Sequence, residues 1–227
     1  MIASYAAKAT WPAGFVLYQR GTPADGLFVV VRGRVVLRNR VKAGRGFVPA
    51  IAAEGETFGA EGLAPNATYV TDARADEETE TYHLSSARFR AFVREQPQHA
   101  LALVGQVTAE HAALLGKLRE LATLSVEQRL VAAVARLARH AAFVAPDGRV
   151  VLSPPQYRLL CELVGATRES VTLVINRLVG QGLAERNGSD FVLAPAHQLL
   201  QRMEYDAFDG ELPIPVVSNG DLRAAHA

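Results

Sequence analysis

The segment Val164-Gly165-Ala166-Thr167-Arg168-Glu169-Ser170-Val171 is the most informative part of this 227-residue chain. Gly165 predicts a tight turn, and Thr167 is a residue type that caps the first turn of a helix. The helix that follows extends to Val179 and carries an apolar stripe at helical spacing. The members of this stripe are Val171, Ile175 and Leu178. The segment therefore predicts a turn followed by an amphipathic helix.

The residues on either side of this segment complete a supersecondary motif. A helix is predicted over residues 156–164, directly before the turn. Residues 183–186 and 191–193 are strand-like and flank Asn187-Gly188-Ser189, which is typical of a hairpin turn. Two helices joined by a glycine turn and followed by a hairpin form a winged helix-turn-helix. We therefore predict this module within residues 125–202.

The outward-facing residues of the second helix are candidates for reading DNA. A recognition helix enters the major groove by its N-terminus, so its first residues reach the base edges. Arg168 suits guanine through a bidentate contact, and Glu169 can accept from the amino group of cytosine. The same pair also fits an ordinary solvated helix start. The candidate DNA-binding residues are Gln156, Thr167, Arg168, Glu169, Ser170, Thr172, Leu173 and Asn176.

A long helix over residues 98–123 precedes the module. Apolar residues recur along it at alternating spacings of four and three, which is typical of a coiled-coil pair. A helix packed only on its own domain would also have an apolar face. The predicted dimer seam is Val104, Val107, His111, Leu114, Leu118 and Leu121. A capping box at Ser125 and Gln128 then opens a helix that we expect to reach about Phe143.

Short strands punctuated by glycine fill the N-terminal part of the chain. The strand-like runs are residues 15–18, 27–31, 34–37 and 47–51. This spacing predicts a small barrel, roll or sandwich and gives the chain an α+β fold class. We expect four parts: residues 1–97 as this β domain, residues 98–124 as a dimerisation helix, residues 125–202 as the winged helix-turn-helix, and residues 203–227 as an acidic, loosely ordered tail.

Composition excludes several classes of protein. The net charge is +1, from 24 basic and 23 acidic residues, so DNA binding would require basic residues gathered on one surface. The longest plain apolar run, residues 27–31, is far too short for a membrane span, and no secretory signal is visible. With one cysteine, Cys161, no internal disulfide can form, and we expect a cytoplasmic location. The six histidines show no metal-ligand spacing, so we expect no metal or other cofactor.

The segment over residues 164–171 resembles the Crp/Fnr superfamily of bacterial transcription regulators, in which it is similar to V-G-x-[ST]-R-E-[ST]-V. Residues 121–130 resemble the family's hinge and first DNA-domain helix, and residues 21–33 resemble its β-roll. The resemblance covers roughly residues 12–200. It implies a homodimeric regulator, not an enzyme, that binds double-stranded DNA at a two-fold-symmetric site and contacts RNA polymerase. Leu173 stands where the family often has a basic residue, which removes one contact to a base or phosphate. The alternative is that Leu173 replaces it by a contact to a thymine methyl group.

The effector pocket is a second place where the sequence departs from the family. In members that bind cyclic AMP, a Gly-Glu pair holds the ribose and an Arg-Ser pair holds the cyclic phosphate. Gly59 agrees with this pattern, but Ala60 replaces the glutamate unless Glu61 serves. Tyr69-Val70 replace the Arg-Ser pair. The full set of pocket positions is Gly59, Ala60, Glu61, Tyr69, Val70, Leu114 and Leu115, the two leucines replacing hydroxyls that face the adenine.

These replacements predict DNA binding that is independent of cyclic AMP. The alternative is a regulator whose β-roll binds a different small molecule or a cyclic nucleotide. Two rivals come from other classes. A β-roll metalloenzyme would need clustered histidines such as His-x-His, and a ligand-binding module acting through protein contacts alone would not bind genomic DNA. The basic run between Arg32 and Arg45 fits a solvated strand face, with contact to RNA polymerase or DNA phosphates as the alternative.

Overall fold

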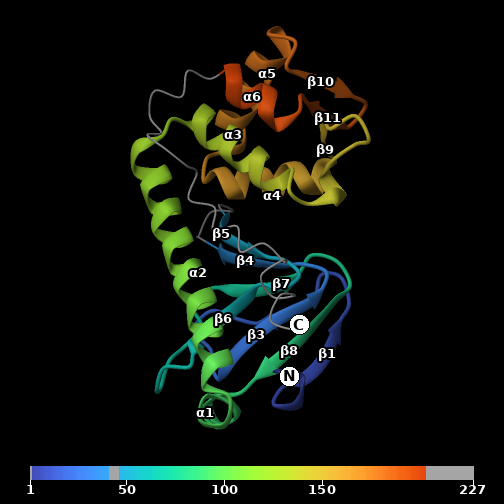
Figure 1. Ribbon diagram of the computed structural model, residues 1–227. Coiled ribbons are helices and arrows are strands. Elements are labelled where there is room, and N and C mark those ends of the chain that lie inside the picture. Colours follow the sequence, from blue (N-terminus) through green and yellow to red (C-terminus); the bar gives the residue numbers. More distant parts are fainter. Residues whose placement is uncertain (1, 41–45, 203–227) are drawn as a thin grey trace. The chain divides into compact units, whose positions relative to one another are not determined.

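The chain mixes α-helices and β-strands in each of two compact units (Figure 1). The computed structural model describes residues 2–40 and 46–202. The described residues divide into a first unit of residues 2–39 and 49–116, and a second unit of residues 40, 46–48 and 117–202. The α+β class predicted from the sequence is confirmed. The predicted tail over residues 203–227 lies outside the described residues.

Two four-stranded sheets and helix α1 (Ser86–Glu95) make up most of the first unit. One sheet has the strand order β1-β8-β3-β6, and the other has the order β2-β7-β4-β5. The four strands predicted from the sequence correspond to β2 to β5. The elements before α1 are η1 (Ile2–Ser4), β1 (Ala7–Trp11), β2 (Val16–Tyr18), β3 (Gly26–Arg32), β4 (Val35–Arg40), β5 (Gly46–Ala52), β6 (Thr57–Gly62), β7 (Asp72–Ala75) and β8 (Thr79–Leu84).

Apolar side chains fill both faces of the central strand β3, because successive residues of a strand point to opposite sides. Phe28 and Val30 join a buried cluster with residues of both sheets, including Phe58 of β6 and Tyr18 of β2. Leu27 points the other way and packs in a second cluster under α1. The first unit therefore has one core between its sheets and another beneath its helix.

Gly26 is required where β3 begins. Its φ is +79°, a conformation that side chains of L-residues rarely adopt. A Cβ at this position would lie 1.9 Å from the carbonyl oxygen of Leu84. The start of β3 and the end of β8 can approach this closely only because residue 26 has no side chain.

Helix α2 (Pro97–Thr123) runs from the first unit into the second. It begins one residue before the predicted start and ends at the predicted residue. The capping box at Ser125 is present: Gln128 N–H donates to Ser125 Oγ at 3.2 Å, and Ser125 N–H donates to Gln128 Oε1 at 2.9 Å. These local bonds start helix α3 (Val126–Leu137).

The predicted extension of this helix to Phe143 is wrong. Helix α3 ends at Leu137, His140 is extended, and a 3-10 turn η2 (Ala141–Phe143) follows. In a continued helix, Phe143 would point away from the face that buries Leu130, Val134 and Leu137, because six residues advance the helix by about 600°. The break at His140 turns Phe143 inward, where it is 1% exposed.

The winged helix-turn-helix elements appear in the predicted order. Ser153 and Gln156 form a capping box at the start of α4, and Gly165 ends that helix with φ +65°. The strands form a sheet of order β10-β11-β9, in which Arg186 pairs with Phe191 across the hairpin. The elements are β9 (Val150–Leu152), α4 (Pro154–Val164), α5 (Arg168–Gly180), β10 (Ala184–Asn187), β11 (Asp190–Leu193) and α6 (Ala196–Arg202).

Candidate nucleic-acid interface and β-roll cavity

Thr167 holds the start of α5. Its Oγ1 accepts from Ser170 N–H at 3.2 Å, and its hydroxyl lies 3.0 Å from the Ser170 hydroxyl. This satisfies one of the amides that a helix N-terminus leaves without a partner. Both side chains are half-buried. They therefore shape the turn and leave the next residues, Arg168 and Glu169, exposed at the end of the helix.

Tyr157 joins α4 to α5. Its hydroxyl lies 2.7 Å from the hydroxyl of Thr172, which also donates to the carbonyl oxygen of Arg168 at 2.7 Å. The Arg168 guanidinium lies 5.6 Å from the centre of the Tyr157 ring, within the range of a cation–π contact. These contacts fix the angle between the two helices of the motif and guide the direction of Arg168.

The predicted DNA-binding set divides into two groups. Gln156 belongs to the capping box of α4, and its amide also lies 3.4 Å from the carbonyl oxygen of Ala142. Together with Thr167, Ser170 and Thr172, it holds the motif in shape. The remaining predicted residues are exposed on α5: Arg168, Glu169, Leu173 and Asn176.

Arg177 extends the exposed face and was not among the predicted residues. It lies one turn after Leu173, and its guanidinium donates to Glu127 of α3 at 2.5 Å. The Arg177 side chain is 62% exposed, so this ion pair contributes little to stability. The signal that could have found it is the spacing of four residues from Glu169 through Leu173 to Arg177.

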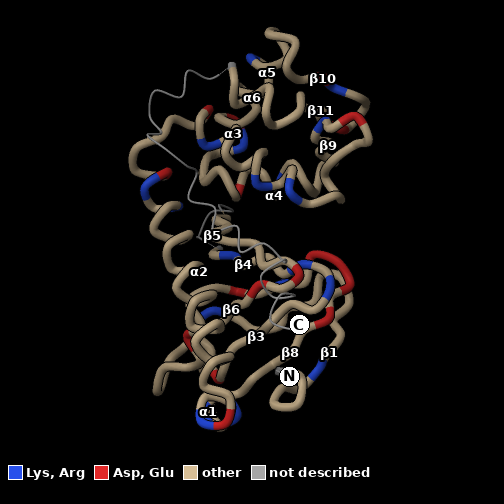
Figure 2. Tube along the Cα trace, viewed as in Figure 1, with Lys and Arg blue, Asp and Glu red and all other residues tan. Residues whose placement is uncertain are grey.

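Positive charge is concentrated in the second part of the chain. Residues 117–202 include eleven Lys and Arg and seven Asp and Glu, which gives this part a charge of +4 although the whole chain carries only +1. Figure 2 shows Lys and Arg on α3, α4 and α5. The exposed members include Arg158 on α4 and Arg168 on α5. This is the charge balance that contact with a phosphate backbone requires.

A buried ionic network ties the end of α2 to the helix-turn-helix. Lys117 Nζ donates to Glu120 Oε2 at 3.1 Å and to the carbonyl oxygen of Leu163 at 2.6 Å. Arg136 of α3 binds both oxygens of Glu120, at 2.6 and 2.9 Å. Burial lowers the pKa of Lys117 to about 8, with a further contribution from the positive charge of Arg136. The apolar pattern of the sequence did not indicate this network.

An apolar stripe lies exposed along α2. Its large members are Leu101, Val104, Leu114, Leu115 and Leu118. His111 is also exposed, whereas Val107 and Leu121 of the predicted seam are half-buried. The exposed positions Leu101, Val104, Thr108, His111, Leu115, Leu118 and Ala122 are separated by alternating steps of three and four. This is the spacing of a coiled-coil seam, shifted by one residue at every second position from the predicted seam.

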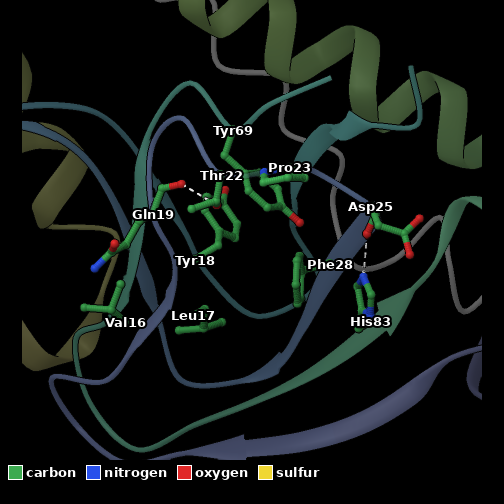
Figure 3. Close-up of a pocket in the computed structure, with 10 residues that line it drawn as sticks. All are labelled: Val16, Leu17, Tyr18, Gln19, Thr22, Pro23, Asp25, Phe28, Tyr69 and His83. Atoms are coloured by element: carbon green, nitrogen blue, oxygen red, sulfur yellow. Dashed lines mark hydrogen bonds between the residues drawn. The ribbon is translucent and has the colours of Figure 1, made fainter. Parts of the chain in front are cut away.

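A cavity of about 460 Å³ opens in the first unit and is lined mainly by aromatic and aliphatic side chains (Figure 3). Tyr18 and Tyr69 stack face to face, with ring centres 3.6 Å apart and planes 7° apart. Phe28 and His83 form a second stacked pair at 4.5 Å. The only Asp, Glu, Lys or Arg among its described lining residues is Asp25. These residues therefore present rings and no Lys or Arg side chain to the cavity.

Of the predicted pocket positions, only Tyr69 lines this cavity, and Gly59 lies beside its rings. Leu114 and Leu115 are exposed on α2 and do not line it. A Cβ on Gly59 would lie 3.3 to 3.4 Å from atoms of Phe28, Tyr18 and Tyr69, so the aromatic side chains already occupy the space beside it. Tyr69 is buried, whereas Val70 is 58% exposed. Neither side chain can pair with a phosphate as a guanidinium does.

Two carboxyl groups lie close to this aromatic cluster. Glu110 of α2 accepts a hydrogen bond from Thr57 of β6, and burial raises its pKa to about 7, with Glu56 and Glu61 adding to the effect. Burial also raises the pKa of Tyr18, and the negative charge of Glu61 contributes. A second anion placed here would meet repulsion from these groups. The negative charge of Glu61 therefore repels a cyclic phosphate, whereas the arginine of the family's Arg-Ser pair would attract it.

His83 and Arg34 have structural partners, and Cys161 lies in the interior. His83 Nε2 lies 2.6 Å from the carbonyl oxygen of Asp25. Cys161 is buried, and burial raises the pKa of its thiol. Arg34 of the basic run pairs with Asp76 at 3.0 Å, and its side chain is only 11% exposed, so the solvated-face prediction is wrong at this residue. Lys42 and Arg45 lie outside the described residues.

Residues 2–40 and 46–202 contain neither a metal-binding cluster nor a membrane-spanning helix. No group of three or more His, Cys, Asp or Glu side chains in these ranges is placed to hold a metal ion. No helix in the same ranges is both long and apolar enough to cross a membrane.

Comparison with known proteins agrees with these features. Residues 8–96 match the cyclic nucleotide-binding domain family. The chain is 24% identical to the cAMP-activated global transcriptional regulator CRP of Salmonella typhimurium over 185 residues, which cover 81% of this chain and 87% of that protein. It is 21% identical over 195 residues to a CRP-like cAMP-activated global transcriptional regulator of Mycobacterium tuberculosis, covering 85% of this chain and 86% of that one.

Solved structures of similar fold come from the same group. A CRP/FNR-family transcriptional regulator of Thermus thermophilus superposes with a TM-score of 0.74 at 23% identity, covering 86% of this chain and 97% of that one. The c-di-GMP responsive global regulator CLP of Xanthomonas campestris gives a TM-score of 0.73 at 22% identity, covering 85% and 96%. The family match places a cyclic nucleotide-binding domain at residues 8–96, and the curated relatives and solved structures make this chain similar in sequence and fold to regulators of the Crp/Fnr type.

Proposed function

We propose that this protein is a homodimeric, sequence-specific DNA-binding regulator of transcription that acts in the cytoplasm without cyclic AMP. The DNA site is double-stranded and two-fold symmetric, and each protomer places α5 in the major groove of one half-site. RNA polymerase is the expected protein partner, by resemblance to the family. No catalytic step is part of this function.

The exposed N-terminal half of α5 is the observation that carries the proposal. Thr167 caps the helix, and Tyr157 and Thr172 fix it against α4, while Arg168 and Glu169 are left exposed. A helix with a fixed N-terminus and exposed polar side chains there suits readout of base edges. The charge of +4 over residues 117–202 supports the accompanying phosphate contacts.

The exposed stripe on α2 supports the homodimer. Exposed apolar side chains at alternating steps of three and four are the pattern by which two long helices pair. A second copy of the chain carries the same stripe, so the pair is self-complementary around a two-fold axis. A two-fold-symmetric protein in turn fits a two-fold-symmetric DNA site.

The β-roll supports independence from cyclic AMP. A cyclic phosphate is an anion, and burying it without a paired cation costs several kcal/mol. Tyr69 and Val70 offer no positive charge, and Glu61 places negative charge near the aromatic cluster. On the helix side, Leu114 and Leu115 have neither donors nor acceptors for an adenine.

The cavity favours a second candidate function, a regulator that responds to a different small molecule. Its volume of about 460 Å³ is large enough for a small ligand, and its rings favour a flat, uncharged one. Mixing the purified protein with a library of uncharged aromatic compounds, and following the resonances of His83 and Tyr69 by NMR, tests this candidate. Shifts at low micromolar concentration would support it.

A gel-shift selection tests the main proposal. Purified full-length protein is mixed with genomic DNA fragments, and the bound fragments are sequenced after several rounds. We expect a shared motif with two-fold symmetry and retention of the fragments in the presence of excess competitor DNA. Binding without any sequence preference, or no binding at physiological salt, would contradict the proposal.

A further inference from the structure

We propose that Leu173 recognises the 5-methyl group of a thymine at one position in each half of the DNA site. This inference rests on the proposed function and specifies one element of its sequence preference. Leu173 would act by apolar contact alone and would therefore distinguish thymine from the three other bases.

The side chain of Leu173 is largely exposed to solvent. Leu173 is 69% exposed, more than any other large hydrophobic side chain described in the second unit. An exposed leucine contributes almost nothing to the stability of the isolated fold, because its surface stays in water. The motif's own packing is supplied by the buried residues of α5: Val171, Val174, Ile175 and Leu178.

The place of Leu173 on α5 is the second observation. It lies in the middle of the exposed face, with Glu169 one turn before it and Asn176 and Arg177 one turn after it. Leu173 itself lies in the N-terminal half of α5, five residues after the exposed Arg168. The exposed neighbours of Leu173 along this face are polar, so Leu173 is not part of a larger apolar patch. A hydrophobic protein partner would need such a patch, and this face does not provide one.

The chemistry of base edges then selects the partner. In the major groove each base pair shows hydrogen-bond donors and acceptors, and only thymine adds a methyl group. A leucine side chain has neither a donor nor an acceptor. Over a G·C pair it would shield polar atoms from water without replacing their hydrogen bonds, which is unfavourable. Over thymine it covers a methyl group, which is favourable.

Removal of single methyl groups from the DNA tests the inference. The preferred site is first obtained by selection from random double-stranded DNA. Each thymine is then replaced singly by deoxyuridine, which lacks only the methyl group, and affinity is measured by fluorescence anisotropy. For one thymine per half-site we expect about fourfold weaker binding on replacement in one half and about sixteenfold on replacement in both.

The variant Leu173→Ala identifies the side chain responsible. With this variant, the same replacement should have less than about a twofold effect, while the effects of other base changes persist. Val179→Ala is the matched control, because it shortens an exposed apolar side chain near the C-terminal end of the same helix, and it should keep the full deoxyuridine effect. Circular dichroism and thermal unfolding check that both variants are folded.

The outcomes separate this inference from the proposed function. Selection that yields no specific site overturns the proposed function, and this inference with it. A specific site at which no deoxyuridine replacement weakens binding, or at which the loss is equal in wild type and Leu173→Ala, overturns the inference alone. A loss that disappears only in Leu173→Ala supports it.

Discussion

Some side chains of the helix-turn-helix hold the turn in shape, and others remain exposed on its surface. Thr167 was recognised as a cap from the sequence, because capping depends on residues three positions apart. Gln156 was predicted only as a DNA-binding residue, although its spacing of three from Ser153 is that of the capping box in which it lies. The exposure of Arg168 also follows from its position directly after the cap. By contrast, the sequence does not show that Thr172 is engaged with Tyr157, because that contact depends on how α4 and α5 cross.

Arg168→Ala tests the readout by a single side chain. We expect a loss of about 1–3 kcal/mol of specific binding, with relaxed preference at one base pair of each half-site, because a bidentate contact to guanine is removed. Competition binding with sites altered at each position measures both effects. Arg158→Ala removes the same charge from α4 and serves as the control; unchanged preference in Arg168→Ala would contradict the assignment.

Glu110 and Lys117 are residues whose importance the sequence did not indicate. Both lie on α2 among residues of mixed polarity, so periodicity alone suggests solvent-facing side chains. Their burial depends on segments distant in sequence: Thr57 of β6 for Glu110 and Leu163 of α4 for Lys117. Contacts of this kind follow from the tertiary fold and leave no local signal.

Glu110→Gln should change how stability depends on pH. The folded protein raises the pKa of Glu110 to about 7 from 4.5, so it binds more protons than the unfolded chain between these values. The stabilising effect of the neutral carboxyl is complete below about pH 4.5 and is lost as pH rises through about 7. The glutamine variant stays neutral and should be more stable than wild type at pH 8. The expected gain is about 1.4 kcal/mol for every unit by which folding raises the pKa.

Urea denaturation at pH 5 and pH 8 measures this difference. The control is Glu54→Gln, which removes an exposed carboxyl from the same region. We expect the control to follow the wild-type pH dependence. An equal decrease in the free energy of unfolding between pH 5 and pH 8 in wild type and Glu110→Gln would show that Glu110 is already ionised at pH 5.

At the level of elements, helix α2 shows how far periodicity predicts structure. Its length and its apolar character were predictable because apolar residues repeat every three or four positions. The face that remains exposed was predictable only in part. Val104, His111 and Leu118 belong both to the seam predicted from the sequence and to the exposed stripe in the structure. Val107 and Leu121 are half-buried instead, because the helix also packs on its own chain, and one sequence pattern must serve both contacts.

Leu118→Glu should prevent pairing through this stripe. The variant places a carboxylate where two copies of α2 are proposed to meet, and an unpaired buried charge costs several kcal/mol. We expect self-association weaker by about a hundredfold or more in sedimentation experiments at several concentrations. Ala102→Glu adds the same charge on another side of α2 and should leave association unchanged. A persistent dimer in Leu118→Glu would locate the interface elsewhere.

His111→Leu should have the opposite effect. In a parallel pair His111 meets its own copy, so two protonated rings would repel each other, and burying a polar group is less favourable than burying a leucine. We expect a tighter dimer in sedimentation experiments at several concentrations. A weaker dimer in the variant would show that the imidazole has a hydrogen-bond partner across the seam.

At the level of the whole molecule, the class of fold was predictable from a short motif together with its surroundings. Residues 164–171 indicated the helix-turn-helix, and glycine-punctuated strands indicated the β domain. The break after α3 was not predictable, since it results from the burial of Phe143 in the finished unit. Likewise, the replaced pocket residues were visible in the sequence, but the ring stacking that fills their surroundings was not.

Independence from cyclic AMP is the prediction that concerns the protein as a whole. Calorimetric titration with cyclic AMP and with cyclic GMP should show no binding in the micromolar range, because the described residues that line the cavity include no Lys or Arg to pair with the phosphate. Gel shifts of the selected DNA site should be the same with and without either nucleotide. Micromolar binding, or DNA binding that appears only after nucleotide is added, would show that the pocket alignment is wrong.

The exposed stripe on α2 also has a consequence for gene control. If the monomer must pair before it holds both half-sites, the concentration of the active species depends on the square of the monomer concentration whenever dimers are scarce. A twofold change in synthesis or degradation would then change promoter occupancy by about fourfold in that regime. Leu101, Val104, Leu115 and Leu118 would thus make the cellular dosage of the protein the signal to which its target genes respond.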